Sequence, residues 1–147
     1  MQLKKAGVTS ITRLAGANAY VTSQQIANWT TGNLKNGNYG TYKGKALAYV
    51  KFQPTTKMVP NKLAVSTGQN WLDALAGAAV CGKNRSVMLL ADAKGGNHYA
   101  NAVAFCTANR TKMGSAYVFG GTSAVNATTW NALVAATKWT ETVYTIG

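Results

Sequence analysis

Lysines and tyrosines are interleaved through one long segment of the chain, residues 30–62, which contains no acidic residue. Ammonium groups attract phosphate and carboxylate groups, and tyrosine rings offer flat faces to sugars or bases. More cations follow between residues 83 and 112. This pattern favours a surface that binds an acidic polymer, although lysines on solvated loops would give the same pattern. The residues concerned are Lys35, Lys43, Lys45, Lys51, Lys57, Lys62, Lys83, Arg85, Lys94, Arg110 and Lys112, with Tyr39, Tyr42 and Tyr49.

The charge balance of the whole chain supports the same interpretation. Its 147 residues include 15 lysines and arginines against 3 acidic residues, for a formal net charge of +12. The field of such a charge reaches about 8–10 Å at moderate salt and attracts polyanions. Nucleic acid, an anionic membrane face and an acidic wall polymer are the candidate partners. A basic surface that only keeps the protein soluble is the alternative.

Residues suited to catalysis are scarce. His98 is the sole histidine, and the few carboxylates lie well apart in sequence, so neither a metal site nor a carboxylate pair is indicated. A nucleophile formed by His98 with Cys81 or Cys106 stays open, but both cysteines lie in apolar stretches. The two cysteines permit one disulfide between helices or, alternatively, are two buried thiols. We therefore expect no enzyme activity and no cofactor.

The size and hydropathy of the chain indicate one folded domain, residues 1–147. About 47% of the residues are hydrophobic, which is too many for a disordered chain. No apolar run approaches the roughly 20 residues of a membrane helix. Residues 1–5 are basic but are not followed by an apolar stretch, so they are not a signal peptide. If the protein is secreted, this chain is a mature or excised piece.

Apolar, β-prone runs alternate with helical patterns of ten or so residues in the second half of the chain. Such alternation predicts a parallel sheet with right-handed crossovers. The runs are continuously apolar and the helices rich in alanine, as expected for a sheet covered on both faces. We predict an α/β fold, a three-layer open parallel sheet of flavodoxin-like or similar type. The strands are 63–66, 86–91, 116–119 and 142–146, and the helices are 71–82, 98–109 and 125–137.

The first half of the chain is less regular. We expect a short strand at residues 10–14 and a helix from Gln24, capped by Thr22 or Ser23. Residues 33–42 read as a loop because Gly and Asn are frequent there. Residues 46–52 are a candidate strand or hairpin arm.

Small polar residues follow three of the expected strands, at 67–70, 95–97 and 120–123. Ligands of open parallel sheets bind beyond the carboxyl ends of strands, and helix N-termini favour anions. These turns are therefore candidate anion sites. The simpler interpretation is that their glycines allow tight turns and their Asn or Ser residues cap helices.

Three segments, residues 13–23, 66–77 and 117–125, resemble in order and spacing the cell-wall-binding repeat 2 family of Gram-positive surface proteins. That family reads R-aG-dRY-Ta, then sG-nfpDAL-a, then v-ylGG-avs. One copy covers about residues 8–147 here, and residues 30–62 are longer than the family implies. The matching positions are Arg13, Gly16, Tyr20, Gly68, Asp73, Gly120 and Gly121.

The chain departs from the family pattern at two places. Ala19 stands where the family has Arg before the Tyr, which removes one cation. Residues 87–90 align with a family segment written PILL that is implicated in polymer binding, with Val87 at the Pro position. We interpret Leu89 and Leu90 as core support, and Asp73 in the first turn of its helix as fixing the fold.

The resemblance implies a non-catalytic, extracellular module that anchors a protein on the cell wall by binding an anionic, teichoic-acid-like polysaccharide. It also implies association in threes, so we expect a homo-oligomer. A nucleic-acid-binding domain and a self-assembling surface (S-layer) protein are the alternatives. A wall-degrading enzyme is a third, although the family places such activity in a separate domain. The residues expected to bind the polymer are Arg13, Lys35, Lys43, Lys45, Lys51, Arg85 and Lys94.

Overall fold

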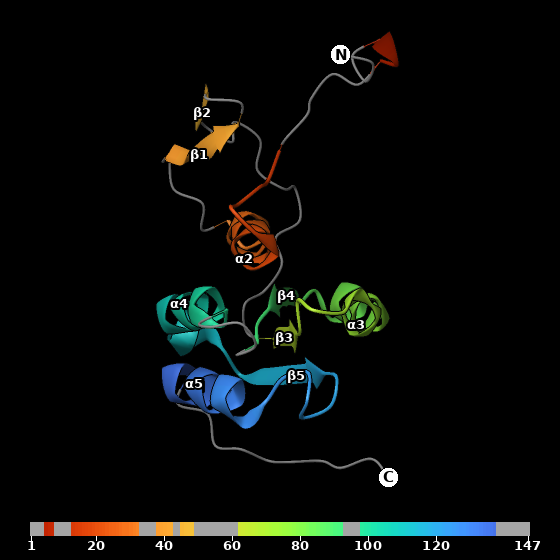
Figure 1. The fold of residues 1–147 in the computed structure, drawn as a ribbon, viewed down its shortest axis with the longest axis vertical. Coiled ribbons are helices and arrows are strands. Elements are labelled where there is room, and N and C mark those ends of the chain that lie inside the picture. Colours follow the sequence, from red (N-terminus) through yellow and green to blue (C-terminus); the bar gives the residue numbers. More distant parts are fainter. Residues whose placement is uncertain are drawn as a thin grey trace.

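The computed structural model describes residues 5–7, 13–32, 38–42, 45–48, 62–92 and 98–137 (Figure 1). Its helices are α2 (Ala19–Thr30), α3 (Trp71–Asn84), α4 (Ala100–Asn109) and α5 (Ala127–Thr137), with a 3-10 turn η1 (Arg110–Lys112) after α4. Its strands are β1 (Asn38–Tyr42), β2 (Lys45–Ala48), β3 (Lys62–Ser66), β4 (Val87–Leu90) and β5 (Ser115–Phe119).

A three-stranded parallel sheet with the order β4-β3-β5 forms the centre of the described chain. Val65 of β3 lies opposite Leu89 on one side and Val118 on the other. Because β3 pairs along both edges, its apolar residues are fully buried. Each strand begins within one residue of its predicted start, which confirms the predicted parallel α/β sheet.

Helices cover both faces of this sheet, so the predicted three layers are present (Figure 1). Leu63, Val65 and Leu89 belong to one buried cluster with Phe105 of α4 and Leu133 of α5. The alternate strand residues face α3, since successive side chains of a strand point to opposite faces. On that face Gly77 of α3 lies so close to Phe119 that an added Cβ would be 2.5 Å from the ring.

Helix α2 lies beside β4 and also packs against α4. It begins at Ala19 instead of at Gln24, and its cap is Asn18 instead of Thr22 or Ser23. The side chain of Asn18 accepts a 2.9 Å hydrogen bond from the amide of Val21. Asn is as good a cap as Ser, so the sequence offered several starts and tertiary packing selects the earliest one.

A second sheet, the antiparallel hairpin β1-β2, corrects the prediction of a loop over residues 33–42. Thr41 lies opposite Ala46, and Tyr42 lies opposite Lys45. Tyr and Thr favour strands, but the Gly and Asn residues between them obscured this preference. Residues 45–48 form the expected hairpin arm.

Some predicted elements fall wholly or partly outside the described residues. These are the strand at 142–146, residues 49–52, and residues 10–12 of the first strand. Arg13 and Leu14, at the end of that first strand, have no strand structure.

The two cysteines are free and buried, as expected for two structural thiols and not for a disulfide. Cys81 belongs to α3, whereas Cys106 of α4 lies in the cluster on the other face of the sheet. None of the described helices is long and apolar enough to cross a membrane.

Candidate functional site

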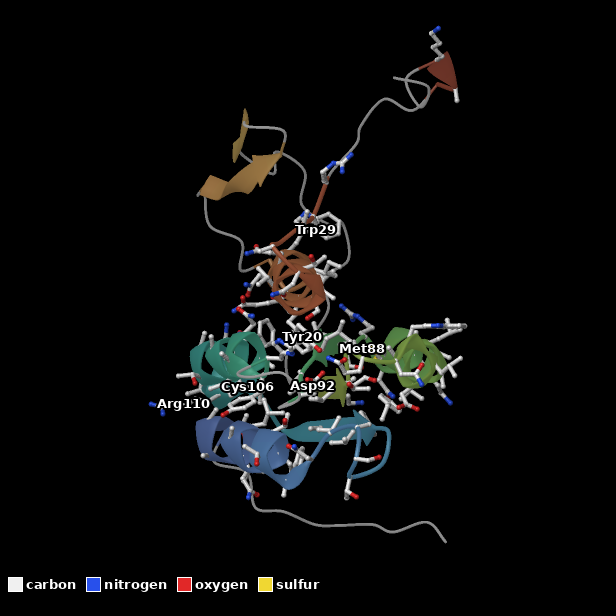
Figure 2. The ribbon with its side chains drawn as sticks, viewed as in Figure 1. Tyr20, Trp29, Met88, Asp92, Cys106 and Arg110 are labelled. Atoms are coloured by element: carbon white, nitrogen blue, oxygen red, sulfur yellow. The ribbon has the colours of Figure 1, made fainter. Side chains whose placement is uncertain are left out.

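A buried carboxylate, Asp92, lies directly beyond the carboxyl end of β4, and only 2% of its surface is exposed. Its Oδ2 accepts hydrogen bonds from the hydroxyl of Tyr20 at 2.5 Å, the hydroxyl of Thr67 at 3.1 Å and the amide of Gly68 at 3.2 Å. Tyr20 comes from α2, and Thr67 and Gly68 follow β3. Figure 2 shows Tyr20 and Asp92 together between α2 and the sheet.

Two more side chains surround this cluster. The Nδ1 atom of His98 lies 3.4 Å from Oδ1 of Asp92, and the His98 ring stacks on Tyr20 with 4.4 Å between ring centroids. Gln69 donates a 2.9 Å hydrogen bond from Nε2 to the Tyr20 hydroxyl. Asp92 is therefore bonded to groups from α2, from the end of β3 and from the residues before α4.

Hydrogen bonds keep Asp92 ionised although it is buried. Burial by itself raises the pKa of this carboxyl, but the donors Tyr20, Gly68, Thr67 and His98 outweigh burial and hold its pKa below the ordinary value. Burial, followed by the bond to Asp92, raises the pKa of Tyr20 to about 12. The cluster therefore holds a neutral tyrosine against a carboxylate over a wide pH range.

The Asp92 cluster is structural, because it connects α2 to the ends of strands β3 and β4. Among the described residues no three His, Cys, Asp or Glu side chains come together as a metal site. The Asp92 oxygens are occupied by protein donors and are closed to solvent. The carboxylate of Asp92 thus serves to hold α2 against the strand ends.

Tyr20 and Gly68, two of the motif positions, meet in this cluster. A Cβ on Gly68 would lie 2.6 Å from the Tyr20 ring, so any larger residue would displace the tyrosine. Gly16 precedes α2 and donates a 2.9 Å hydrogen bond from its amide to the Thr22 hydroxyl. These positions lie where one element contacts the next.

A second pair of motif positions joins α3 to the turn after β5. Gly120 has a φ of +107°, which L side chains rarely adopt, and a Cβ there would lie 2.6 Å from Oδ2 of Asp73. The carbonyl of Gly121 accepts hydrogen bonds from the amides of Ala124 and Val125 at 2.9 and 3.1 Å. Asp73 itself is half-buried in the first turn of α3.

The strand aligned with the family's PILL segment divides its side chains between two environments. Leu89 is fully buried in the cluster with α4 and α5. Met88 and Leu90 are half-buried and line a groove of about 320 Å³ between α2 and α3. Leu89 is therefore part of the buried core, whereas Leu90 lines the groove.

The cations expected to bind polymer are only partly described. Arg13 and Arg85 are exposed, and Arg85 ends α3 in a left-handed conformation with a φ of 54°. Lys45 opens β2. The remaining candidates, Lys35, Lys43, Lys51 and Lys94, lie outside the described residues.

Sequence reasoning missed both the Asp92 cluster and the groove between α2 and α3. A signal for the first was present, because Asp92 follows an apolar strand directly and is one of 3 acidic residues. Nothing in the sequence indicated the groove, since its walls come from residues 23–30, 78–81 and 86–90.

One of the comparisons with known proteins identifies the family of this chain. The family model for Cell wall binding domain 2 (CWB2) matches residues 13–129, which is most of the chain. The search of curated proteins gave no match, and neither did the search of solved structures. Domains of this family are binding modules, not catalytic ones, and anchor proteins to the cell wall surface. The chain belongs to the Cell wall binding domain 2 (CWB2) family.

Proposed function

We propose that this domain holds its protein on a Gram-positive cell wall by binding an anionic wall polymer through many lysine and arginine contacts. The observation that carries this proposal is the family match to a wall-binding domain in a chain with a formal net charge of +12. Each contact is worth little on its own, so the polymer is held by their sum and the binding is weakened by salt.

The distribution of charge over the described residues supports this function. Asp92 is buried and Asp73 is half-buried, so neither presents a fully exposed carboxylate. Exposed cations, in contrast, occur on several elements. A polyanion approaching these elements therefore meets attraction with little opposing charge. The exposed cations are Lys5, Arg13, Lys83, Arg85, Arg110 and Lys112.

Co-sedimentation with purified Gram-positive walls tests the proposal. The chain is mixed with walls before and after chemical removal of the covalently attached anionic polymers, at low and high salt. Binding that is lost on removal of the polymers and at high salt is the expected result. Binding that persists on stripped walls would contradict it, and tight binding to DNA without binding to walls would favour the nucleic-acid alternative.

We also propose that copies of the domain associate, as the family resemblance implies. Helix α3 is apolar around most of its circumference, yet the sheet covers only one side of it. Trp71 is 69% exposed and Leu75 is 62% exposed, with Leu72 beside them. A helix that is apolar on all sides is usually buried, so this uncovered face supports an interface with a second copy. Light scattering at working concentration that gives the monomer mass would refute association.

A further inference from the structure

Four cations lie at the edge of the parallel sheet where its strands begin. Lys62 is the first residue of β3, Lys83 and Arg85 lie at the end of α3, before β4, and Lys112 ends η1, before β5. Parallel strands begin at one shared edge, and the helices that connect them return to it. We call these four residues the amino-edge row. Arg110 lies farther out, on the outer side of α4 (Figure 2).

Lys62 has a central place in this row. Its Nζ atom donates a 3.4 Å hydrogen bond to Oδ1 of Asn84, which stands between Lys83 and Arg85 in the sequence. On its other side Lys62 lies opposite Ser115, the first residue of β5. Neighbouring strands are about 4.8 Å apart, so the three strand starts span roughly 10 Å. Over such a distance the fields of like charges reinforce one another at moderate salt.

The amino edge contains no carboxylate among the residues that the structure describes. Asp92 follows β4 and Asp73 lies in the first turn of α3, so both belong to the opposite, carboxyl edge. The turns at 67–70 and 120–123, which are candidate anion sites by sequence, lie beside these two carboxylates. An anionic chain is therefore attracted to the amino edge and opposed at the carboxyl edge.

Arg85 occupies a backbone position that glycine normally takes. Its φ of 54° is the only positive φ among the described residues other than glycine. Its amide bonds to the carbonyl of Gly82 at 3.3 Å, and the amide of Ser86 bonds to the carbonyl of Cys81 at 3.0 Å. These two bonds form a Schellman motif, in which the left-handed residue is usually glycine. An exposed arginine at a strained position points to a function for its side chain.

Interaction with a helix end explains only part of the row. A cation in the last turn of a helix is favoured by the helix dipole, which accounts for Lys83. The dipole does not account for Lys62, which begins a strand, or for an arginine where glycine would cause less strain. Attraction of an anionic ligand accounts for all four positions.

We propose that the acidic wall polymer lies across the amino edge of the sheet, with its anionic groups held by Lys62, Lys83, Arg85 and Lys112. The ligand is a linear chain of phosphate or carboxylate groups, because the cations extend over the starts of three strands. The lysines act as point charges, and the guanidinium of Arg85 can bind an anionic group through two hydrogen bonds. This inference rests on the proposed function and deepens it by giving the polymer a site.

Calorimetric titration of the whole chain tests the site. Long-chain sodium polyphosphate and polygalacturonate are the probes, since the first carries phosphates and the second carboxylates. We expect at least one of them to bind, and the better ligand identifies the anionic group. Each contact to a linear polyanion contributes about 0.7 to the slope of log K against log salt concentration, as for single-stranded nucleic acid. The slope therefore counts the cations that contact the probe. No binding of either probe would overturn the inference.

Variants then assign the contacts to the amino edge. Arg85→Gln and Lys112→Gln should each weaken binding of the better probe and lower its salt slope by the contribution of one contact. Lys5→Gln is the matched control, because it removes the same charge from an exposed site and residues 5–7 lie far from the sheet (Figure 1). We expect its slope to equal that of the wild type. Equal reductions in all three variants, or no reduction in any, would overturn the inference.

Two substitutions of Arg85 separate ligand binding from folding. Arg85→Gly removes the charge and relieves the backbone, so the probe should bind more weakly while the midpoint of thermal unfolding does not fall. Arg85→Lys keeps the charge and should bind like the wild type. A lower midpoint with unchanged binding in Arg85→Gly would show that the arginine serves the fold, and would overturn its assignment to the polymer.

Co-sedimentation with walls distinguishes failure of this site from failure of the proposed function. If the wild type sediments in a polymer-dependent manner and a variant carrying both Lys83→Gln and Lys112→Gln sediments equally, the amino-edge inference is wrong and the anchoring function stands. If the probes bind with the expected slopes but the chain does not sediment with walls, the amino edge is a polyanion site and the anchoring function is wrong.

Discussion

The hydroxyl of Tyr20 donates a 2.5 Å hydrogen bond to Oδ2 of Asp92, across 72 residues of sequence. This bond joins the first turn of α2 to the end of β4, and both side chains are buried. Because the carboxylate is charged and shielded from water, each donor that it accepts from is worth more than a surface hydrogen bond. The relationship explains why a tyrosine occupies the start of α2.

Removal of this hydroxyl should destabilise the domain. Tyr20→Phe leaves Asp92 without its shortest donor, and we expect a loss of about 1–3 kcal/mol in the free energy of unfolding. Urea denaturation followed by tryptophan fluorescence measures it. Tyr117→Phe is the control, because Tyr117 is partly exposed and its hydroxyl bonds to none of the residues that the structure describes. Equal losses in the two variants would show that the Asp92 bond has no special role.

The low pKa of Asp92 predicts a specific acid dependence of stability. In the unfolded chain the carboxyl has its ordinary pKa of 3.8, and in the folded chain the pKa is lower. The folded state therefore gains stability from Asp92 above pH 3.8 and loses it as the pH falls through the folded pKa. The difference in unfolding free energy between the wild type and Asp92→Asn should shrink below pH 3.8. A difference that is constant with pH would contradict this assignment.

Two glycine substitutions should have opposite effects. Gly68→Ala places a methyl group against the Tyr20 ring and should destabilise the domain and raise the exposure of Tyr20. Gly82→Ala is the matched control, because no atom lies within 4 Å of an added Cβ there and the residue lies inside α3. We expect Gly82→Ala to stabilise the domain by up to about 1 kcal/mol. Thermal unfolding by circular dichroism compares the two.

A charge on the uncovered face of α3 should affect association but not folding. Leu75→Lys places an ammonium group in the exposed apolar patch, so we expect a smaller mass by light scattering with an unchanged midpoint of thermal unfolding. Thr107→Lys adds the same charge at an exposed site on α4 and should leave the mass unchanged. If both variants reduce the mass equally, total charge and not the α3 face controls association.

Charge reversal in the long basic segment should weaken wall binding. Lys43→Glu and Lys45→Glu each replace an attraction for the polymer by a repulsion, so the amount of chain that sediments with walls at low salt should fall. Lys45→Arg keeps the charge and should bind like the wild type. Unchanged sedimentation of the Glu variants would show that this segment is not the polymer site.

The regular half of the fold was predictable because its signals are local. The strand and helix from Leu63 to Asn84 follow from an apolar run, a capping Asn70 and an alanine-rich helix. The start of α2 could not be predicted from the sequence. Asn18 and Thr22 can both cap a helix, and packing against β4 decides which of them does so. Strand β1 was missed because its Gly and Asn residues obscured the strand preference of its Tyr and Thr residues.

The candidate site was predictable only in part. The motif positions Tyr20 and Gly68 were marked by the resemblance, but their shared partner Asp92 was not, since nothing in the sequence shows which residues meet at the ends of β3 and β4. The groove between α2 and α3 carries no sequence signal, because three separate segments of the chain form its walls.

The position of α2 against β4 has a consequence for the order of folding. Helix α2 is too short to be stable alone in water, and its buried side chains find their partners only when residues 87–92 are present. During synthesis or export from the amino end, α2 therefore cannot fold stably until about two thirds of the chain has emerged. The strand pairing of β3 with β5 requires residues 115–119 as well, so the domain completes its sheet late and is open to proteolysis until then.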